Sequence, residues 1–147
     1  VIDNWWSSES GSPITGIALS PHSSKDRKVR KSIKPLPIKP GSAGKPMPGF
    51  DVRIVDDDGK EVERMRMGNI VLGLPLAPTG FRTLWQDDER FYKSYLKRFN
   101  GSFIDTGDAG FIDLDGYVSV MSRSDDIINV AAHRFGTGTR FGTALQI

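Results

Sequence analysis

Two Asp-Gly pairs, Asp58-Gly59 and Asp115-Gly116, each stand between short apolar stretches and predict tight β-hairpins. Before the first pair, apolar and polar residues alternate over 50–54, the period of a half-buried strand, and a return strand is expected near 61–62. Across the second pair, 111–113 and 117–121 are the expected arms. Because such hairpins recur while apolar residues make up only 37% of the chain, we expect a strand-rich α+β fold with a thin core.

Three further elements are predicted from local patterns. The apolar stretch 68–74 and the stretch 127–130 are typical of short strands. Asp87 is a suitable N-cap for a helix over 87–99, in which Phe91, Tyr95 and Phe99 recur every four residues and predict one apolar face. The Pro-, Ser- and Lys-rich segment 21–48 is expected to be an exposed, extended, basic loop.

Composition excludes several classes of protein. The 20 basic and 18 acidic residues nearly balance, so neither a nucleic acid nor a membrane surface is an expected partner. The sequence has no Cys, which excludes disulfides and thiolate metal sites and favours an intracellular protein. The two His residues, His22 and His133, lack metal-ligand spacing, and the acidic run 56–58 lacks the spacing of a calcium loop.

Three short motifs carry groups with binding chemistry. A carboxylate on the expected Gly turn 105–108 (DTGD) could accept both hydroxyls of a ribose, although these residue types also simply shape turns. In 122–126 (SRSDD), an Arg fork could hold a phosphate or ribose oxygen and the paired Asp residues could form a hinge; a surface turn with an ion pair is the alternative. In 5–11 (WWSSESG), a Glu among hydroxyls could hold Mg²⁺ beside a phosphate, or the segment could be an aromatic plug followed by a loop.

Taken in order, four segments resemble the acetyl/propionyl-type, AMP-forming acyl-CoA synthetases of the adenylate-forming superfamily. They are WWSSESG, KPMPGFDVRIVDDDG, GNIVLGLPLAPTGFRTLW and DTGDAGFIDLDGYVSVMSRSDDIINVAAHR. The resemblance runs from about residue 3 to about residue 138 and matches the middle-to-late part of a family member. It implies that 1–124 is the late part of the large N-terminal AMP-binding domain, and that 125–147 is the hinge and the start of the small C-terminal domain.

The resemblance also implies an activity. Such enzymes activate a short-chain carboxylate with ATP and Mg²⁺ to an acyl-adenylate, release pyrophosphate, and pass the acyl group to coenzyme A. The implied roles are Mg²⁺ binding for Glu9, phosphate contact for Ser8, closure of an acetate- or propionate-sized pocket for Trp6, ribose binding for Asp108, support of ribose or phosphate for Arg123, the hinge for Asp125, and approach to the adenylate phosphate or CoA for Arg134.

The chain also departs from the family pattern. Ser7 and Ser8 replace the usual Gln and Thr, Ala132 replaces a Gly, and the sequence diverges after Thr137. The family's phosphate loop and its C-terminal adenylation Lys have no counterpart, so we expect a truncated synthetase that is inactive alone. The alternatives are a non-catalytic piece that binds a nucleotide or a partner through the basic run 25–34, and a truncation product without independent function. A cytoplasmic or mitochondrial location is expected.

Overall fold

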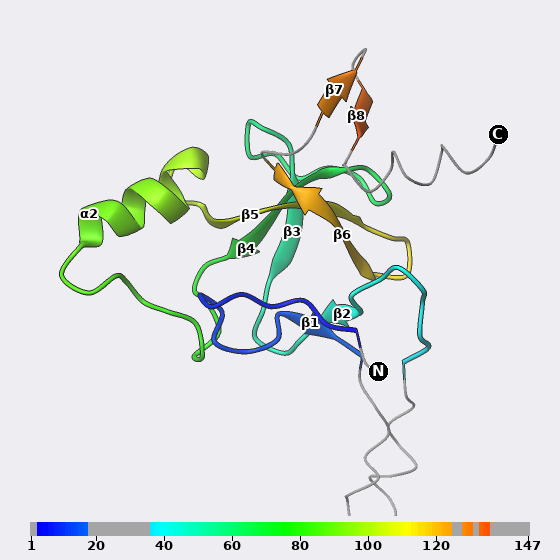
Figure 1. Ribbon diagram of the computed structural model, residues 1–147, viewed down its shortest axis with the longest axis horizontal. Helices are drawn as coiled ribbons and strands as arrows, with labels where there is room; N and C mark the ends of the chain where they lie inside the picture. The colour runs from blue at the N-terminus through cyan, green and yellow to red at the C-terminus, as the bar shows by residue number, and fades with distance from the viewer. Residues whose placement is uncertain (1–2, 18–35, 125–127, 131–132, 136–147) are drawn as a thin grey trace, which may run out of the picture.

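A four-stranded antiparallel sheet forms the centre of the fold (Figure 1). The computed structural model describes residues 3–17, 36–124, 128–130 and 133–135. The strands lie side by side in chain order: β3 (Val52–Val55), β4 (Gly68–Gly73), β5 (Phe103–Ile112) and β6 (Val118–Arg123). The strands predicted near 50–54 and 68–74 and the hairpin across Asp115-Gly116 are therefore confirmed.

The return strand expected near 61–62 is reduced to one antiparallel bridge and its flanking hydrogen bonds. Glu61 makes a single bridge to Val55, and Val62 N–H donates to Ile54 O at 3.0 Å. The chain then turns, with Arg66 N–H donating to Glu63 O, before another strand pair can form. The Asp58-Gly59 turn itself is present, with Gly59 at φ +79°, which glycine adopts without steric cost.

The other described strands form two smaller pairs. Thr15–Gly16 (β1) pairs with Lys45–Pro46 (β2) at one end of the sheet (Figure 1). The neighbouring segment 42–44 joins β6, because Ala43 N–H donates to Val118 O and Val118 N–H donates to Gly44 O. Ile128–Val130 (β7) pairs with His133–Phe135 (β8), which confirms the strand expected at 127–130.

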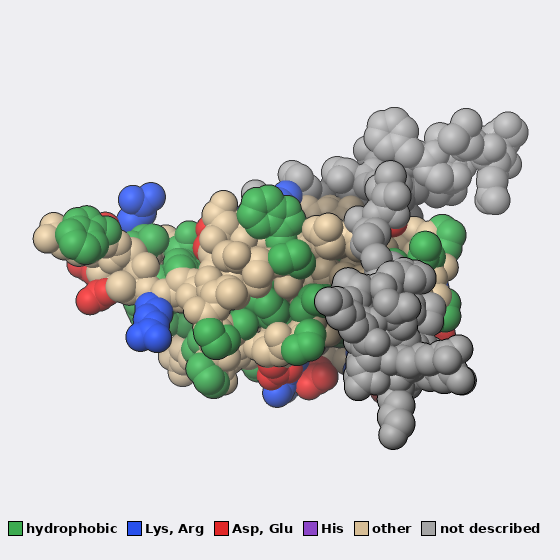
Figure 2. Space-filling view, turned by 90° about the horizontal axis from the view of Figure 1, so that it is seen from below, with side chains coloured by type: hydrophobic (Ala, Val, Ile, Leu, Met, Phe, Trp, Pro, Cys, Tyr) green, Lys and Arg blue, Asp and Glu red, His purple; other side chains and the backbone are tan. Residues whose placement is uncertain are grey.

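The core lies on both faces of β4, whose residues are all buried. On one face, Ile70 and Leu72 belong to the larger apolar cluster, together with Trp5, Ile14, Val52, Ile54, Ile104, Ile112 and Val118. On the other face, Val71 packs with Val55 and Phe99. Figure 2 shows that hydrophobic side chains also reach the surface on one face, with charged side chains mostly toward its margins.

The helical segment expected over 87–99 is present, but it is not one regular α-helix. It consists of α2 (Asp88–Phe91), the π-helical turn η1 (Tyr92–Leu96) and the 3₁₀ turn η2 (Lys97–Phe99). Asp87 caps it as predicted, accepting from Arg90 N–H at 3.0 Å. The prediction of a single apolar face is wrong, because Phe91 and Tyr95 pack on the larger cluster whereas Phe99 packs on the smaller one. A change of helical pitch between them separates side chains that a regular helix would align. No helix among the described residues is long and apolar enough to cross a bilayer.

The Gly turn expected at 105–108 is a bulge inside β5. Asp105 pairs with Val71 and Asp108 pairs with Ile70, so two residues of β5 have no partner across the ladder. Gly107 takes φ +69°, and Thr106 Oγ1 donates to Ile70 O at 2.6 Å. Pairing with β4 continues on both sides, so these residues change the direction of the strand without ending it.

Candidate functional site

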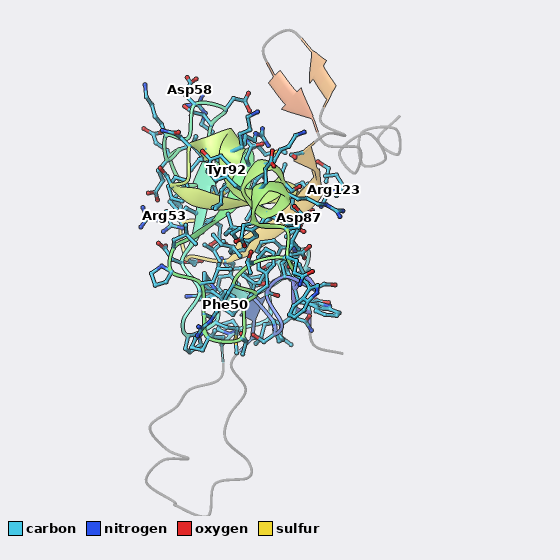
Figure 3. The ribbon with its side chains drawn as sticks, turned by 90° about the vertical axis from the view of Figure 1, so that its left-hand side faces the viewer. Phe50, Arg53, Asp58, Asp87, Tyr92 and Arg123 are labelled. Carbon is cyan, nitrogen blue, oxygen red and sulfur yellow. The ribbon has the colours of Figure 1, made fainter. Side chains whose placement is uncertain are left out.

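One cavity of about 410 Å³ brings together residues of the motifs 5–11 and 105–108 and Arg123 of the motif 122–126. Its walls come from the loop 6–9, from the bulge 104–108 of β5, from the end of β6 and from the helical segment. The lining side chains that carry polar chemistry are those of Ser7, Glu9, Ser94, Tyr95, Asp105, Thr106, Asp108 and Arg123. In Figure 3, Arg123 and Arg53 lie on opposite sides of the molecule, and the cavity is on the side of Arg123.

Asp108 is held by two donors from distant parts of the chain. Trp5 Nε1 donates to Asp108 Oδ2 at 3.0 Å, and Arg123 Nη1 donates to Asp108 Oδ1 at 3.1 Å. The Asp108 side chain is 18% exposed. Since a carboxylate can accept about four hydrogen bonds, these two contacts fix the plane of the group and leave acceptor capacity toward the cavity.

The bulge is shaped by its own side chains. Asp105 Oδ1 accepts from Gly107 N–H at 2.9 Å, and Thr106 Oγ1 accepts from Asp108 N–H at 3.2 Å. Arg123 Nη1 also donates to Thr106 O at 3.3 Å, so the guanidinium lies across the bulge. A Cβ on Gly107 would overlap that guanidinium. Glycine adopts this positive φ without steric cost, and any larger residue would also require the guanidinium to move.

Glu9 enters the cavity from the loop after the two Trp residues. Tyr95 Oη donates to Glu9 Oε1 at 3.0 Å. Partial burial alone would raise the pKa of Glu9, but hydrogen bonds from its own backbone N–H, from Tyr95 and from Ser7, together with the charge of Arg123, hold that pKa below its usual value. Glu9 is therefore a carboxylate at neutral pH and presents negative charge to the cavity.

The loop that carries Glu9 is tightly fixed. The fully buried Ser10 hydroxyl accepts from Ser7 N–H at 3.1 Å and lies 2.7 Å from the acceptors Ser7 O and Ser12 O. Gly11 has φ +62° and lies so close to Thr79 O that a Cβ would overlap it. Phe81 N–H donates to Glu9 O at 2.9 Å. The loop is thus bound to the segment 79–81, far away in sequence.

The sequence-predicted residues have different outcomes. Trp6 lines the cavity but is 61% exposed, whereas its neighbour Trp5 is the buried one and contacts Asp108. Ser8 is exposed and does not line the cavity, which gives no support to its expected phosphate contact. The backbone of Arg134 lies in β8, but its side chain is outside the described residues. Also outside them are Asp125, Ala132, the basic run 25–34 and the divergent tail 138–147.

Sequence reasoning missed two residues that hold the site. Tyr95 was assigned only to an apolar helix face, although its hydroxyl reaches Glu9. Trp5 was not separated from Trp6, although its indole N–H holds Asp108. A polar group at the end of an aromatic ring on a buried face was the available signal, since a buried phenol or indole usually finds a partner.

The donor set suits a cation that arrives with a phosphate. No group of three His, Cys, Asp or Glu side chains among the residues with described side chains could hold a metal ion by itself. Mg²⁺ is commonly held by one or two carboxylates plus substrate phosphates, so the ionised Glu9 beside the cavity fits such an ion.

Comparisons with known proteins confirm the resemblance. No family model matches the chain. The chain is 44% identical over 138 residues to acyl-CoA synthetase short-chain family member 3, mitochondrial, of Bos taurus, covering 94% of this chain and 18% of the relative. It is 37% identical to the propionate–CoA ligase of Salmonella typhimurium, over 93% of this chain and 20% of that protein. The chain therefore spans about a fifth of the length of the curated relatives it matches.

Solved structures agree on the fold. The anthranilate CoA ligase AuaEII, in complex with anthranoyl-AMP, matches with a TM-score of 0.71 and 28% identity, over 99% of this chain and 24% of that one. O-succinylbenzoate coenzyme A synthetase of Bacillus subtilis, in complex with ATP and magnesium ion, matches with a TM-score of 0.67 and 24% identity, over 99% of this chain and 26% of that one. The strand-rich fold expected from the sequence is thus that of part of an adenylate-forming enzyme domain.

Proposed function

We propose that this chain forms the ribose- and magnesium-binding wall of an AMP-forming short-chain acyl-CoA synthetase. The intact enzyme would convert a short acid such as acetate or propionate, with ATP and CoA, into acyl-CoA, AMP and pyrophosphate. The observation that carries the proposal is the meeting of Glu9, Asp108 and Arg123 at one cavity, although more than 95 residues separate Glu9 from the other two. The sequence similarity to short-chain synthetases supports the same assignment.

Asp108 is the group that would bind the ribose. A vicinal diol can donate one hydrogen bond to each oxygen of a carboxylate, and charge-assisted hydrogen bonds of this kind are stronger than neutral ones. Trp5 and Arg123 already fix the plane of Asp108, so little side-chain entropy is lost when the sugar binds. Arg123, whose Nη1 donates to Asp108 Oδ1 and to Thr106 O, would support the same ribose or a neighbouring phosphate oxygen.

Glu9 would share Mg²⁺ with the phosphate oxygens of ATP. The ion would neutralise charge that develops on the α-phosphate when the carboxylate attacks it. The chain contributes an ionised, oriented carboxylate from a fixed loop, and Arg123 adds positive charge to the same cavity. Such chemistry needs no protein nucleophile, which agrees with a lining that holds carboxylates, hydroxyls and an arginine.

Trp6 would form the apolar wall against the acyl group. It lines the cavity near Leu76 and Phe81, and a bulky indole in that place would favour short acids. Asp125 as the hinge and Arg134 as the group near the adenylate or CoA remain predictions from the resemblance. The relative of Bos taurus is named as mitochondrial, which supports the mitochondrial alternative for the intact enzyme.

An NMR titration of the 147-residue chain tests the ribose assignment. AMP is expected to shift the amide resonances of Gly107 and Asp108, whereas 2′,3′-dideoxy-AMP, which lacks the diol, should bind at least tenfold more weakly, because bonds to an ionised group are worth roughly 1.5–3 kcal/mol. Equal affinity for the two nucleotides would contradict ribose binding by Asp108.

An ATP–pyrophosphate exchange assay with acetate or propionate tests the second part of the proposal. The isolated chain should give no exchange, because the phosphate loop and the adenylation Lys that the resemblance implies have no counterpart in these 147 residues. Robust exchange by the isolated chain would overturn that part of the proposal and would show that the 147 residues are catalytically sufficient.

A further inference from the structure

Two side chains of the helical segment reach the two carboxylate-bearing walls of the cavity. Tyr95 and Arg98 stand three residues apart, near its C-terminal end. Tyr95 Oη donates to Glu9 Oε1 at 3.0 Å, and Arg98 Nη1 donates to Asp105 Oδ2 at 3.2 Å. Glu9 lies on the loop after the Trp pair and Asp105 begins the bulge of β5, so one short element touches both walls.

Arg98 is fixed on the sheet by a buried amide. Its Nη2 donates to Asn69 Oδ1 at 3.0 Å and to Asp57 Oδ1 at 3.2 Å. Asn69 is fully buried in β4, and its Nδ2 donates in turn to Asp57 Oδ1 at 3.1 Å and to Val55 O at 3.5 Å. A guanidinium with three acceptors in fixed positions has a defined direction, unlike an isolated surface ion pair.

A single side chain, that of Asp105, links Arg98 to the backbone that carries Asp108. Asp105 Oδ2 accepts a hydrogen bond from Arg98, and its other oxygen, Oδ1, accepts one from Gly107 N–H at 2.9 Å. Gly107 has the positive φ of the bulge, and Asp108 follows it directly. Rotation of the Asp105 side chain would release the Gly107 amide and loosen the conformation that aims Asp108 into the cavity.

Tyr95 is held just as firmly from its other side. Its ring packs against Phe81 at a centroid distance of 4.9 Å and an interplanar angle of 82°, and against Phe91 at 5.8 Å. Phe81 itself binds the backbone of Glu9. The phenol therefore reaches Glu9 from a fixed ring, and the π-helical turn sets the height of that ring along the segment.

We propose that the helical segment Asp88–Phe99 is the positioning element of the nucleotide cavity. Tyr95 positions Glu9, and Arg98, through Asp105, positions the bulge that carries Asp108. Both are positioning residues, since neither is required to touch the reacting atoms. The inference rests on the proposed function for the identity of the ligand, while the positions of Glu9 and of the bulge can be measured without any ligand.

The Tyr95 half is tested at constant pH by the rotamer of the Glu9 side chain, read from its three-bond Hα–Hβ NMR couplings in the 147-residue chain. Tyr95→Phe removes only the hydroxyl that holds Glu9 Oε1, so the couplings should move toward the values of a freely rotating side chain. Tyr92→Phe is the matched control, since Tyr92 lies in the same turn and is exposed. Couplings in Tyr95→Phe that match those of Tyr92→Phe would overturn this half.

The Arg98 half is tested by hydrogen exchange of the Gly107 amide. Arg98→Gln should speed that exchange about tenfold relative to amides of β4, since a local hydrogen bond to a charged acceptor is loosened. Arg53→Gln is the matched control, because Arg53 is a comparably exposed arginine that pairs with Asp51 and Glu61 rather than with Asp105. Arg98→Lys keeps the charge without the fork and should show the same change in a milder form. Exchange no faster than in Arg53→Gln would overturn this half.

Nucleotide binding separates the two proposals. If the variants change the Glu9 couplings and the Gly107 exchange while AMP and Mg·ATP bind nowhere near them, the positioning role stands and the proposed function fails. If AMP binds at Asp108 in a diol-dependent way but the variants alter neither readout nor the affinity, the positioning role fails and the function stands. Where both hold, Arg98→Gln weakens AMP binding severalfold, and Tyr95→Phe weakens only its Mg²⁺-dependent part.

Discussion

Strand β5 contains one acidic motif and is followed directly by a similar one, and the first of them lines the cavity described above. The bulge 105–108 (DTGD) and the hairpin turn 113–116 (DLDG) each combine two carboxylates with a glycine at positive φ. In each, the first Asp accepts backbone N–H groups: Asp105 from Gly107, and Asp113 from Asp115 and Tyr117. In each, a basic side chain from elsewhere in the chain binds the carboxylates.

The surroundings make the difference. The hairpin turn binds Lys39 through both Asp113 and Asp115, and Lys39 Nζ lies 4.7 Å from the centre of the Tyr117 ring. Tyr117 Oη also donates to Pro37 O at 2.8 Å, so this turn binds the segment that follows the basic run 25–34. The bulge is bordered instead by a cavity with Glu9 and Arg123. Residue types alone therefore do not distinguish the two motifs, whereas their surroundings do.

The largest expected contrast is between Asp108→Asn and Asp113→Asn. Asp108→Asn should weaken AMP binding about 10- to 100-fold, because the amide offers one acceptor where the ribose needs two and removes the charge. Asp113→Asn should leave AMP affinity unchanged and lower the stability of the chain. Isothermal titration and urea unfolding measure the two quantities. The comparison breaks if both variants lose AMP binding equally.

A smaller contrast is expected between the two glycines. Gly107→Ala and Gly116→Ala should each cost roughly 1–2 kcal/mol of unfolding free energy, because alanine is strained at φ +69° and +86°. Only the Cβ at Gly107 would displace the Arg123 guanidinium, since the space around Gly116 is open. AMP affinity should therefore fall in Gly107→Ala and persist in Gly116→Ala. Equal affinities would show that the position of Arg123 does not matter to the ligand.

The smallest effect is the pH dependence of the hairpin turn. Partial burial would raise the pKa of Asp113, but Lys39 and the backbone N–H groups of Tyr117 and Asp115 lower it overall. A depressed carboxyl pKa gives stability that is fully present above the unfolded value of about 4 and is lost as the pH falls through the folded value. Lys39→Met should flatten that acid loss in urea unfolding between about pH 5 and pH 2. The pKa of Glu9 is also lowered, so the free energy of unfolding of Lys39→Met should still fall somewhat with pH. A pH dependence as steep as that of the parent chain would contradict the role of Lys39.

Local patterns predicted the sheet and the cap, since alternation over β3, the apolar stretch of β4 and the Asp115-Gly116 turn depend on neighbours in sequence. The motif 5–11 and the residues Asp108 and Arg123 were also found from sequence, and the structure brings them to one cavity. The bulge at 105–108 was mistaken for a turn because it depends on pairing with β4, more than 30 residues away. The division of the helical segment was not predicted, because it depends on its side chains packing against two separate apolar clusters.

The segments beside the outer strands have a consequence for association between copies. An open sheet exposes unpaired backbone groups on its first and last strands, and such edges recruit strands from other molecules. Here Val62 N–H already occupies Ile54 O on β3, while Ala43 and Gly44 pair with Val118 on β6. Short pieces of the same chain thus cover part of each edge, which shortens the stretch of backbone on which another copy could add a strand and so opposes aggregation.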